Sequence, residues 1–185
     1  VKMSETLRFT GKVISATISG RAGLWYISVQ VEMPDKETIR NDHDVIGVDL
    51  GVETLVTLSN GEKYQGVKAT KKYEKKLRRL QQSLSRSVGS KKGEKKSNNF
   101  WKKQAKISKL YFKIFNARNN QTHALTTMIV KTYKTICVED LHVEQMLSDN
   151  KYAKYIADSS FYEFRRQLEY KANLYGSNMI TADTY

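Results

Sequence analysis

The 185 residues include 32 lysines and arginines against 19 aspartates and glutamates, which gives a formal net charge of +13. A chain of this length can bury a sizeable core as one domain, or as one domain with an attached piece. No apolar run is long enough to cross a bilayer and no signal peptide opens the chain, so we expect a soluble, cytoplasmic protein without membrane association.

The basic residues are concentrated in one segment. Between Lys63 and Arg118 there are 19 lysines and arginines against 2 acidic residues, a local net charge of +17, whereas the rest of the chain is slightly acidic. Charge runs often mark solvated helix faces. An excess this large favours a surface for a polyanion, because neutralising phosphates releases counterions and drives binding.

The first 44 residues have the alternating pattern of β structure. Gly20-Arg21-Ala22-Gly23 supplies a turn between two runs, so we expect a hairpin, followed by a polar linker from Lys36 to Asp44. The block is too small to fold alone and starts at Val1 rather than at a methionine, so we interpret it as the end of a domain that begins earlier. The residues that alternate with more polar neighbours are Leu7, Phe9, Val13, Ser15, Thr17, Trp25, Ile27, Val29 and Val31.

The next block predicts three strands: Ile46–Val48, Leu55–Leu58 and Lys63–Val67. The first strand is apolar and β-branched, and it ends in Asp49-Leu50-Gly51. This places a carboxylate at a strand end, where the small Gly51 would let a phosphate or a metal ion approach the backbone. Asp49 is therefore the first candidate catalytic residue.

Two basic helices should follow, joined by an exposed connection rich in Gly, Ser, Asn and Lys between Ser87 and Asn99. Their apolar residues recur at helical spacing and are predicted to pack in the core, and the second helix continues through Leu125, Met128 and Ile129. The two stripes are Tyr73, Leu77, Leu80 and Leu84, and then Ile107, Leu110, Tyr111 and Ile114.

A further apolar strand, Thr135–Val138, also ends in acid, at Glu139-Asp140. The single cysteine, Cys137, cannot form a disulfide or a cysteine-rich zinc site, and its position predicts a small core residue. An amphipathic helix from Ser159 to Gly176 and a strand from Asn178 to Ala182 should close the chain. The residues predicted to face inward on that helix are Phe161, Phe164, Leu168 and Leu174.

Three strands, a helical region, a strand, a helix and a strand are the element order of an α/β ribonuclease H-like core. Asp49 and Glu139 would then lie at the ends of its first and fourth strands. Phosphodiester hydrolysis benefits from divalent ions, and hard cations prefer carboxylate oxygens, so the pair predicts a site for Mg²⁺ or Mn²⁺. Asp140 should point to the opposite side and is interpreted as a cap or loop residue.

Five runs in consistent order carry a resemblance to a known family: Gly47 to Val52, Leu77 to Arg86, Ile114 to Asn120, Val138 to Leu141 and Leu168 to Ala172. They are similar to the TnpB family of insertion-sequence proteins, often described as transposases and related to type V CRISPR effectors. The resemblance implies a RuvC-like nuclease that cuts target DNA under the direction of a guide RNA. It also implies that residues 1–44 end a wedge domain and that residues 45–185 form the nuclease domain, with a basic helical insert at about 70–120.

The resemblance assigns both catalysis and metal binding to Asp49 and Glu139. In the family a zinc ribbon and a third catalytic aspartate follow the last strand, whereas this sequence stops at Asp183-Thr184-Tyr185. Asp183 precedes the position of the ribbon, so it is not given the third role. Zinc is expected only in that ribbon, and we expect this chain by itself to be a truncated and inactive catalytic domain.

The nucleic-acid interface is predicted on the basic insert. Trp101 is the best candidate for base stacking there, although aromatic residues at helical spacing usually pack in a core. The histidines His43, His123 and His142 lack metal-ligand spacing and are interpreted as structural or solvated. The predicted interface residues are Lys71, Lys72, Lys75, Lys76, Arg78, Arg79, Lys91, Lys92, Lys95, Lys96, Trp101, Lys102, Lys103 and Lys106.

Two alternatives stay open at the level of sequence. A catalytically silent nucleic-acid-binding module would share the basic insert without an active site. An actin-like ATPase fragment would share the strand from Ile46 to Gly51, which resembles a first phosphate loop, but no second glycine-rich loop is visible.

Overall fold

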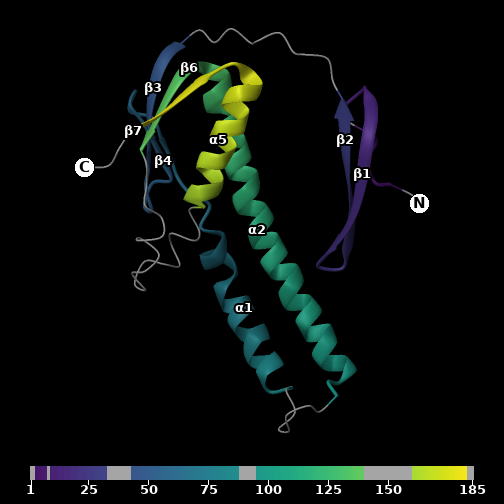
Figure 1. Cartoon of the computed structure of the whole chain (residues 1–185). Helices are drawn as coiled ribbons and strands as arrows, with labels where there is room; N and C mark the ends of the chain where they lie inside the picture. The colour runs from purple at the N-terminus through teal and green to yellow at the C-terminus, as the bar shows by residue number, and fades with distance from the viewer. Residues whose placement is uncertain (1–2, 8, 33–42, 88–94, 140–159, 183–185) are drawn as a thin grey trace.

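The computed structural model describes residues 3–7, 9–32, 43–87, 95–139 and 160–182 (Figure 1). It contains a two-stranded sheet, a five-stranded sheet and three helices among these residues, and the element order agrees with the prediction from sequence. The elements are β1 (Lys12–Arg21), β2 (Leu24–Glu32), β3 (His43–Leu50), β4 (Val56–Leu58), β5 (Lys63–Tyr64), α1 (Ala69–Ser85), α2 (Asn98–Thr132), β6 (Tyr133–Glu139), α5 (Phe161–Tyr175) and β7 (Asn178–Ala182).

The larger sheet has the strand order β5-β4-β3-β6-β7. Strand β4 is antiparallel to both β3 and β5, whereas β6 is parallel to β3 and β7 is parallel to β6. Helices α2 and α5 pack together over one face of this sheet (Figure 1). The sheet is therefore mixed, with its parallel strands connected through helices.

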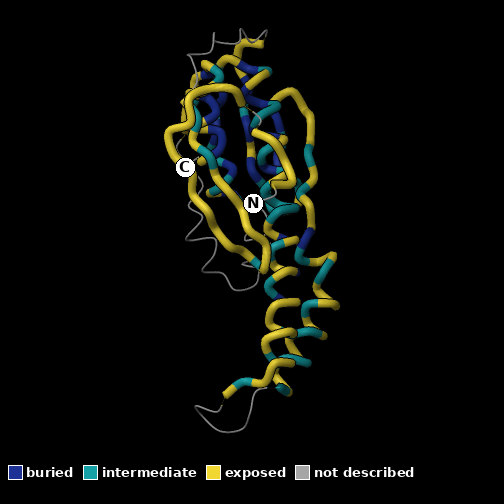
Figure 2. Tube along the Cα trace, turned by 90° about the vertical axis from the view of Figure 1, so that its right-hand side faces the viewer, coloured by how far each residue is buried: buried dark blue, intermediate teal, exposed yellow. Residues whose placement is uncertain are grey.

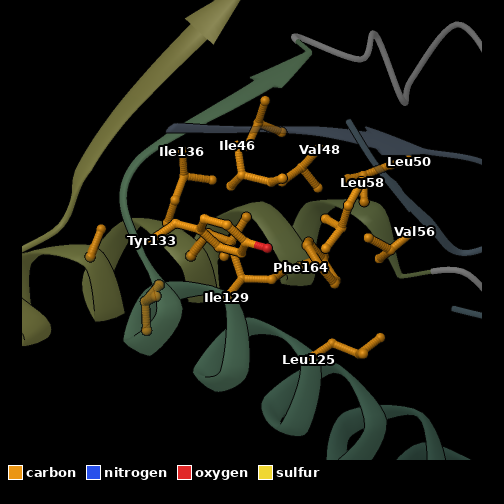
Figure 3. Close-up of a cluster of buried hydrophobic side chains, with 14 of the residues drawn as sticks. Ile46, Val48, Leu50, Val56, Leu58, Leu125, Ile129, Tyr133, Ile136 and Phe164 are labelled. Carbon is orange, nitrogen blue, oxygen red and sulfur yellow. The ribbon is translucent and has the colours of Figure 1, made fainter. Parts of the chain in front are cut away.

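The core lies between the sheet and these two helices (Figure 3). Alternate residues of β3 and β6 point toward the helices, because successive side chains of a strand face opposite sides. Ile46, Val48 and Ile136 are at most 4% exposed, and they meet Ile129 from α2 and Phe164 from α5. Burial of this apolar surface is the main term that holds the helices against the sheet.

The hairpin of β1 and β2 forms as predicted, with Ala22 and Gly23 at positive φ in its two-residue turn. A register shift between Val13 and Ser15 changes which residues share a face. As a result Ile18 pairs with Ile27 on the apolar face, whereas Ser15 and Thr17 pair with polar residues on the other face. The pattern Val13, Ser15 and Thr17 predicts one uninterrupted alternation through β1, and the register shift interrupts it.

Helices α1 and α2 form an antiparallel pair that extends well beyond the sheet (Figures 1 and 2). Helix α2 is 35 residues long and is capped by Ser97, whose hydroxyl accepts a hydrogen bond from the Phe100 amide at 3.2 Å. Its amino-terminal part packs on α1 and its carboxyl-terminal part packs on the sheet and α5. The predicted apolar stripe of α1 is half-buried rather than buried, since Ala69 is the one fully buried residue of that helix.

Four predictions about individual side chains were wrong. Leu174 is 56% exposed because Ala172 and Tyr175, at the correct helical spacing from Leu168, take the inward positions. Tyr111 of α2, predicted to pack in the core, is 48% exposed.

Two of the four wrong predictions concern strand residues. Cys137 pairs with Gly47 and Ile180 on the sheet face that points away from the core, and it is only partly buried. His43 belongs to β3 rather than to a linker, and its ring lies 5.5 Å from that of Tyr133. His142 lies outside the described residues.

In the part of the chain that the structure describes, no helix is both long enough and apolar enough to span a membrane.

Candidate active site and nucleic-acid interface

The candidate acids Asp49 and Glu139 lie on neighbouring strands. The parallel pairing of β3 with β6 runs in register from His43 opposite Tyr133 to Val48 opposite Val138. Asp49 and Glu139 are the next residue on each strand, and both strands include them. The two acids therefore follow the same register at the carboxyl ends of adjacent parallel strands, although 90 positions separate them in the sequence.

Both acids belong to the sheet face opposite the helices. Asp49 is exposed and Glu139 is partly buried, while the preceding Val48 and Val138 point into the core. On the outer strands, Thr57 of β4 pairs with Asp49, and Ala182 of β7 pairs with Glu139. Solvent thus reaches the carboxylates, while their backbones are held by hydrogen bonds of the sheet.

The donor chemistry of this pair fits a hard divalent cation, because Mg²⁺ and Mn²⁺ prefer carboxylate oxygens and keep several waters as ligands. Within the described residues, no group of three or more histidine, cysteine, aspartate or glutamate side chains is placed to hold a metal ion. Asp140 and Asp183 lie outside those residues. The described part of the site is therefore a two-carboxylate site.

Gly51 has a structural explanation within its own loop. A side chain at this position would bring its Cβ to 2.8 Å from the carbonyl oxygen of Thr54, and the Gly51 amide donates to the carbonyl of Leu55 at 3.3 Å. The glycine is thus required for the tight connection from β3 to β4. This close approach explains its presence without an incoming phosphate or metal ion.

The first basic helix begins at the same edge of the sheet as the two acids. Because β4 is antiparallel to both β3 and β5, strand β5 runs in the direction of β3 and ends at the edge where β3 and β6 end. Helix α1 starts a few residues after β5. Gln121 of α2 stabilises the connection between β5 and α1. Its side-chain oxygen accepts a hydrogen bond from the Val67 amide, and its side-chain nitrogen donates to the Gln65 carbonyl, each at 2.6 Å.

Most of the predicted interface residues are exposed. Lys103 is different, because its ammonium group donates to the Ser83 carbonyl at 2.9 Å and to the Ser87 hydroxyl at 2.5 Å, and so joins α2 to the end of α1. Lys96 is partly buried over the ring of Phe100, and Lys91 and Lys92 lie outside the described residues. The exposed members are Lys71, Lys72, Lys75, Lys76, Arg78, Arg79, Lys95, Trp101, Lys102 and Lys106.

A buried lysine, missed in the sequence analysis, fixes α5 on α2. The ammonium group of Lys171 is buried and donates to Thr126 Oγ1 at 2.7 Å, to Thr127 Oγ1 at 2.9 Å and to the His123 carbonyl at 3.0 Å. Burial lowers the pKa of Lys171 to about 8, an effect that the charge of Glu163 opposes. The sequence signal was a lysine at the inward position between Leu168 and Ala172, where an apolar residue is usual.

The chain matches a family model of transposases. A family model described as "Probable transposase" (OrfB_IS605) covers residues 28–149, more than half of the sequence. This match assigns the chain to the class of transposase-related proteins, and the mixed α/β fold agrees with that assignment. The chain belongs to the OrfB_IS605 family, and this membership confirms the resemblance to TnpB proteins.

Two relatives with similar sequences carry a nuclease name. The "Putative RNA-guided DNA endonuclease InsQ" of Escherichia coli (strain K12) is 37% identical over 195 residues, which cover 97% of this chain and 47% of that protein. A "Putative RNA-guided DNA endonuclease" of Streptomyces pristinaespiralis is 31% identical over 189 residues, covering 100% of this chain and 44% of that protein. The chain thus spans about half the length of the curated relatives it matches.

Among solved structures, a chain in the "Cryo-EM structure of the Cas12f1-sgRNA-target DNA complex" has a similar fold. The TM-score is 0.52 at 17% sequence identity, and the alignment covers 86% of this chain and 32% of the other. At this identity the likeness concerns the fold alone.

Proposed function

We propose that this protein is, or is part of, an RNA-guided DNA endonuclease of a transposable element, with a guide RNA and a target DNA as partners. Family membership and the names of the two relatives support this proposal. None of the proteins compared above is named as an ATPase, so the actin-like alternative has no support from them. The observation that carries the catalytic part is the register that sets Asp49 beside Glu139.

The core is proposed to be a RuvC-like member of the ribonuclease H-like folds. The strand order β5-β4-β3-β6-β7, with β6 and β7 parallel to β3, supports this assignment. We further propose that residues 1–44 belong to a wedge domain and that residues 45–185 form the nuclease domain with its helical insert at about 70–120. The separate two-stranded sheet of β1 and β2 supports a division into two units, although β3 of the larger sheet begins two residues before the proposed boundary, at His43.

Asp49 and Glu139 are proposed to hold the divalent ion and to be the catalytic residues. A bound Mg²⁺ or Mn²⁺ would supply activation of the attacking water and stabilisation of the leaving oxygen. The protein's own contribution is positional, because pairing on both sides of β3 and β6 fixes the two backbones at the sheet edge. Both carboxylates lie on the sheet face opposite the helices, where a strand of DNA could reach them.

The exposed lysines and arginines of α1 and of the first part of α2 are proposed to bind the nucleic-acid backbone. Their side chains reach solvent along a helical pair in which α1 begins at the acidic edge, so a bound strand could extend along the pair toward the carboxylates. Phosphate contacts of this kind position a strand without reading its sequence.

A metal-binding measurement tests the acidic pair directly. Titration of Mn²⁺ followed by electron paramagnetic resonance should show binding by the wild-type chain that Asp49→Asn and Glu139→Gln weaken. The matched control is Asp44→Asn, at the opposite end of β3, where the carboxylate pairs with Lys134 at 2.9 Å. Equal loss in the control, or unchanged Mn²⁺ binding in Asp49→Asn, would contradict the assignment.

A cleavage assay distinguishes the nuclease from a silent binding module. With guide RNA bound, Mg²⁺-dependent DNA cleavage should disappear in Asp49→Asn while nucleic-acid binding remains. A silent binding module would bind nucleic acid in both proteins and cleave it in neither. We propose that the 185-residue chain alone cleaves little, because two carboxylates would position a metal ion less precisely than three, and a displacement of about 1 Å can cost roughly a hundredfold in rate. Robust cleavage by that chain would show that another acid completes the site.

A further inference from the structure

A cleft lies where the hairpin turn meets the middle of the helical pair. Residues of the β1–β2 turn, of α1 and of α2 line an open cleft with a volume of about 570 Å³. Arg21 enters from the turn, Leu77 from α1, and Tyr111, Phe112, Phe115 and Arg118 from α2. The volume lies within the range of about 300–1,000 Å³ typical of small-molecule sites.

Two aromatic rings of the cleft are accessible to a ligand. Tyr111 and Phe115 lie one helical turn apart on α2 and are 48% and 44% exposed. The Tyr111 hydroxyl accepts a hydrogen bond from the Gln81 side chain at 3.0 Å, which fixes the ring between the two helices. Rings held in place with exposed surface suit stacking by a flat, unsaturated ligand.

The cleft also presents a cation. The guanidinium of Arg21 lies 4.4 Å from the centre of the Phe115 ring and 5.6 Å from that of Phe112. Two more basic residues of α2 add positive charge here. Arg118 lines the cleft, and the side chain of Lys109 lies against the hairpin turn at Gly23. Among the residues that the structure describes, no aspartate or glutamate lines the cleft. Its charge therefore complements an anion that carries an aromatic group.

We propose that this cleft receives an unpaired nucleobase of a single-stranded nucleic acid lying along the helical pair. The base stacks on the exposed ring of Tyr111 or Phe115, and the adjacent phosphate meets Arg21. The exposed lysines of α1 and α2 on either side indicate a polynucleotide rather than a free nucleotide, because they extend the positive surface beyond the cleft. The inference rests on the proposed backbone binding by the helical pair and adds a base-binding position to it.

Abasic oligonucleotides separate base stacking from phosphate binding. A fluorescein-labelled single strand with bases, in DNA and in RNA form, is compared with an abasic strand that has the same number of phosphates. We expect the strand with bases to bind about tenfold more tightly. A variant that combines Tyr111→Leu with Phe115→Leu should lose most of this advantage and keep the salt dependence of binding. Arg21→Gln should lower the steepness of the salt dependence by about one unit.

Controls keep the result interpretable if a variant folds poorly. Tyr162→Leu removes an aromatic ring that is 73% exposed on α5, and it should leave the preference for bases unchanged. In the wild-type protein, a strand containing 4-thiothymidine should crosslink on irradiation to the peptide that contains Tyr111 and Phe115. A crosslink confined to other peptides would overturn the proposal without any variant.

The failures of the two proposals differ. Equal, salt-dependent binding of strands with bases and abasic strands would overturn the base-binding cleft and leave backbone binding by the helical pair intact. Absence of binding by both strands would overturn both. Tight binding of a free mononucleotide, with no added affinity for the strand, would assign the cleft to a nucleotide and would contradict the proposal of a single strand.

Discussion

The sheet half of the molecule and the projecting helical pair, which comprises α1 and residues 98–118 of α2, use their side chains in different ways. The sheet half buries a continuous apolar cluster between its strands, α5 and the end of α2. The projecting pair has few fully buried residues and leaves most of its lysines and arginines in water (Figure 2). The comparison indicates that the sheet half supplies most of the folding free energy, whereas the pair keeps its charge available for a partner.

The two regions share one continuous element. Helix α2 runs through both, and Ile107, Leu110 and Ile114 are buried in its projecting part. A helix pair with so narrow an apolar seam would be marginal alone, since tertiary packing provides most helix stability in proteins. Continuity with the sheet half therefore holds the basic surface at a fixed position relative to the acidic edge.

The largest expected effect on stability is a cavity in the sheet half. Leu168→Ala removes a side chain that is 0% exposed in the core and should lower the free energy of unfolding by about 2–5 kcal/mol. The matched change Leu80→Ala, at a half-buried position of α1, should cost less than about 2 kcal/mol. Urea denaturation followed by circular dichroism measures both. Equal losses of folding free energy in the two variants would contradict the conclusion that the sheet half supplies most of the stability.

A second test uses the buried ammonium group between α2 and α5. Burial lowers the folded-state pKa of Lys171 to about 8 from 10.5, so the unfolded chain binds more protons between these pH values. The free energy of unfolding should therefore rise with pH in this window for the wild type, relative to Lys171→Met. Denaturation across the window measures the difference. Lys113→Met, at an exposed position of the projecting pair, should give a curve parallel to the wild type.

A third test neutralises the projecting pair. Replacing Lys71, Lys72, Lys75 and Lys76 by Gln should change the free energy of unfolding by less than about 0.5 kcal/mol, because these side chains are exposed and repel one another at i,i+4 spacing. The same variant should bind single-stranded DNA more weakly, with the salt dependence less steep by about 3 units. Fluorescence anisotropy at several salt concentrations measures the DNA affinity and its salt dependence. An unchanged salt dependence would show that the four lysines are solvated and do not contact the nucleic acid.

The smallest effect is expected at the hairpin turn. Ala22 has φ +53°, a region that costs most residues energy, and it is followed by Gly23 in a two-residue turn. Ala22→Asn should slow hydrogen exchange of the β1 and β2 amides by stabilising the hairpin by up to about 1 kcal/mol. Ala22→Val, with a β-branched side chain at positive φ, should accelerate exchange. The same sign for both variants would contradict the explanation.

The order of the elements could be predicted from sequence because the signals are local. A period of about 3.6 residues marked α1, α2 and α5, an apolar β-branched run marked β3, and Gly176 at φ 75 ended α5 as expected. The wrong predictions concern which face of a helix or strand packs against the core. Leu174 and Cys137 are apolar residues inside correctly predicted elements, but each lies on the side that does not meet the core. Composition gives no preference between two faces when apolar residues occupy both.

The secondary structure, the position of the charge excess and the family could all be predicted from sequence, because each depends on the kinds of residues or on residues close together in the chain. The identity and register of neighbouring strands depend instead on how the elements pack. That packing sets Asp49 beside Glu139 across 90 positions, and it brings Arg21 of the hairpin against Phe115 of α2. Such contacts arise from the packing of whole elements around the core, which the short-range patterns of the sequence do not specify.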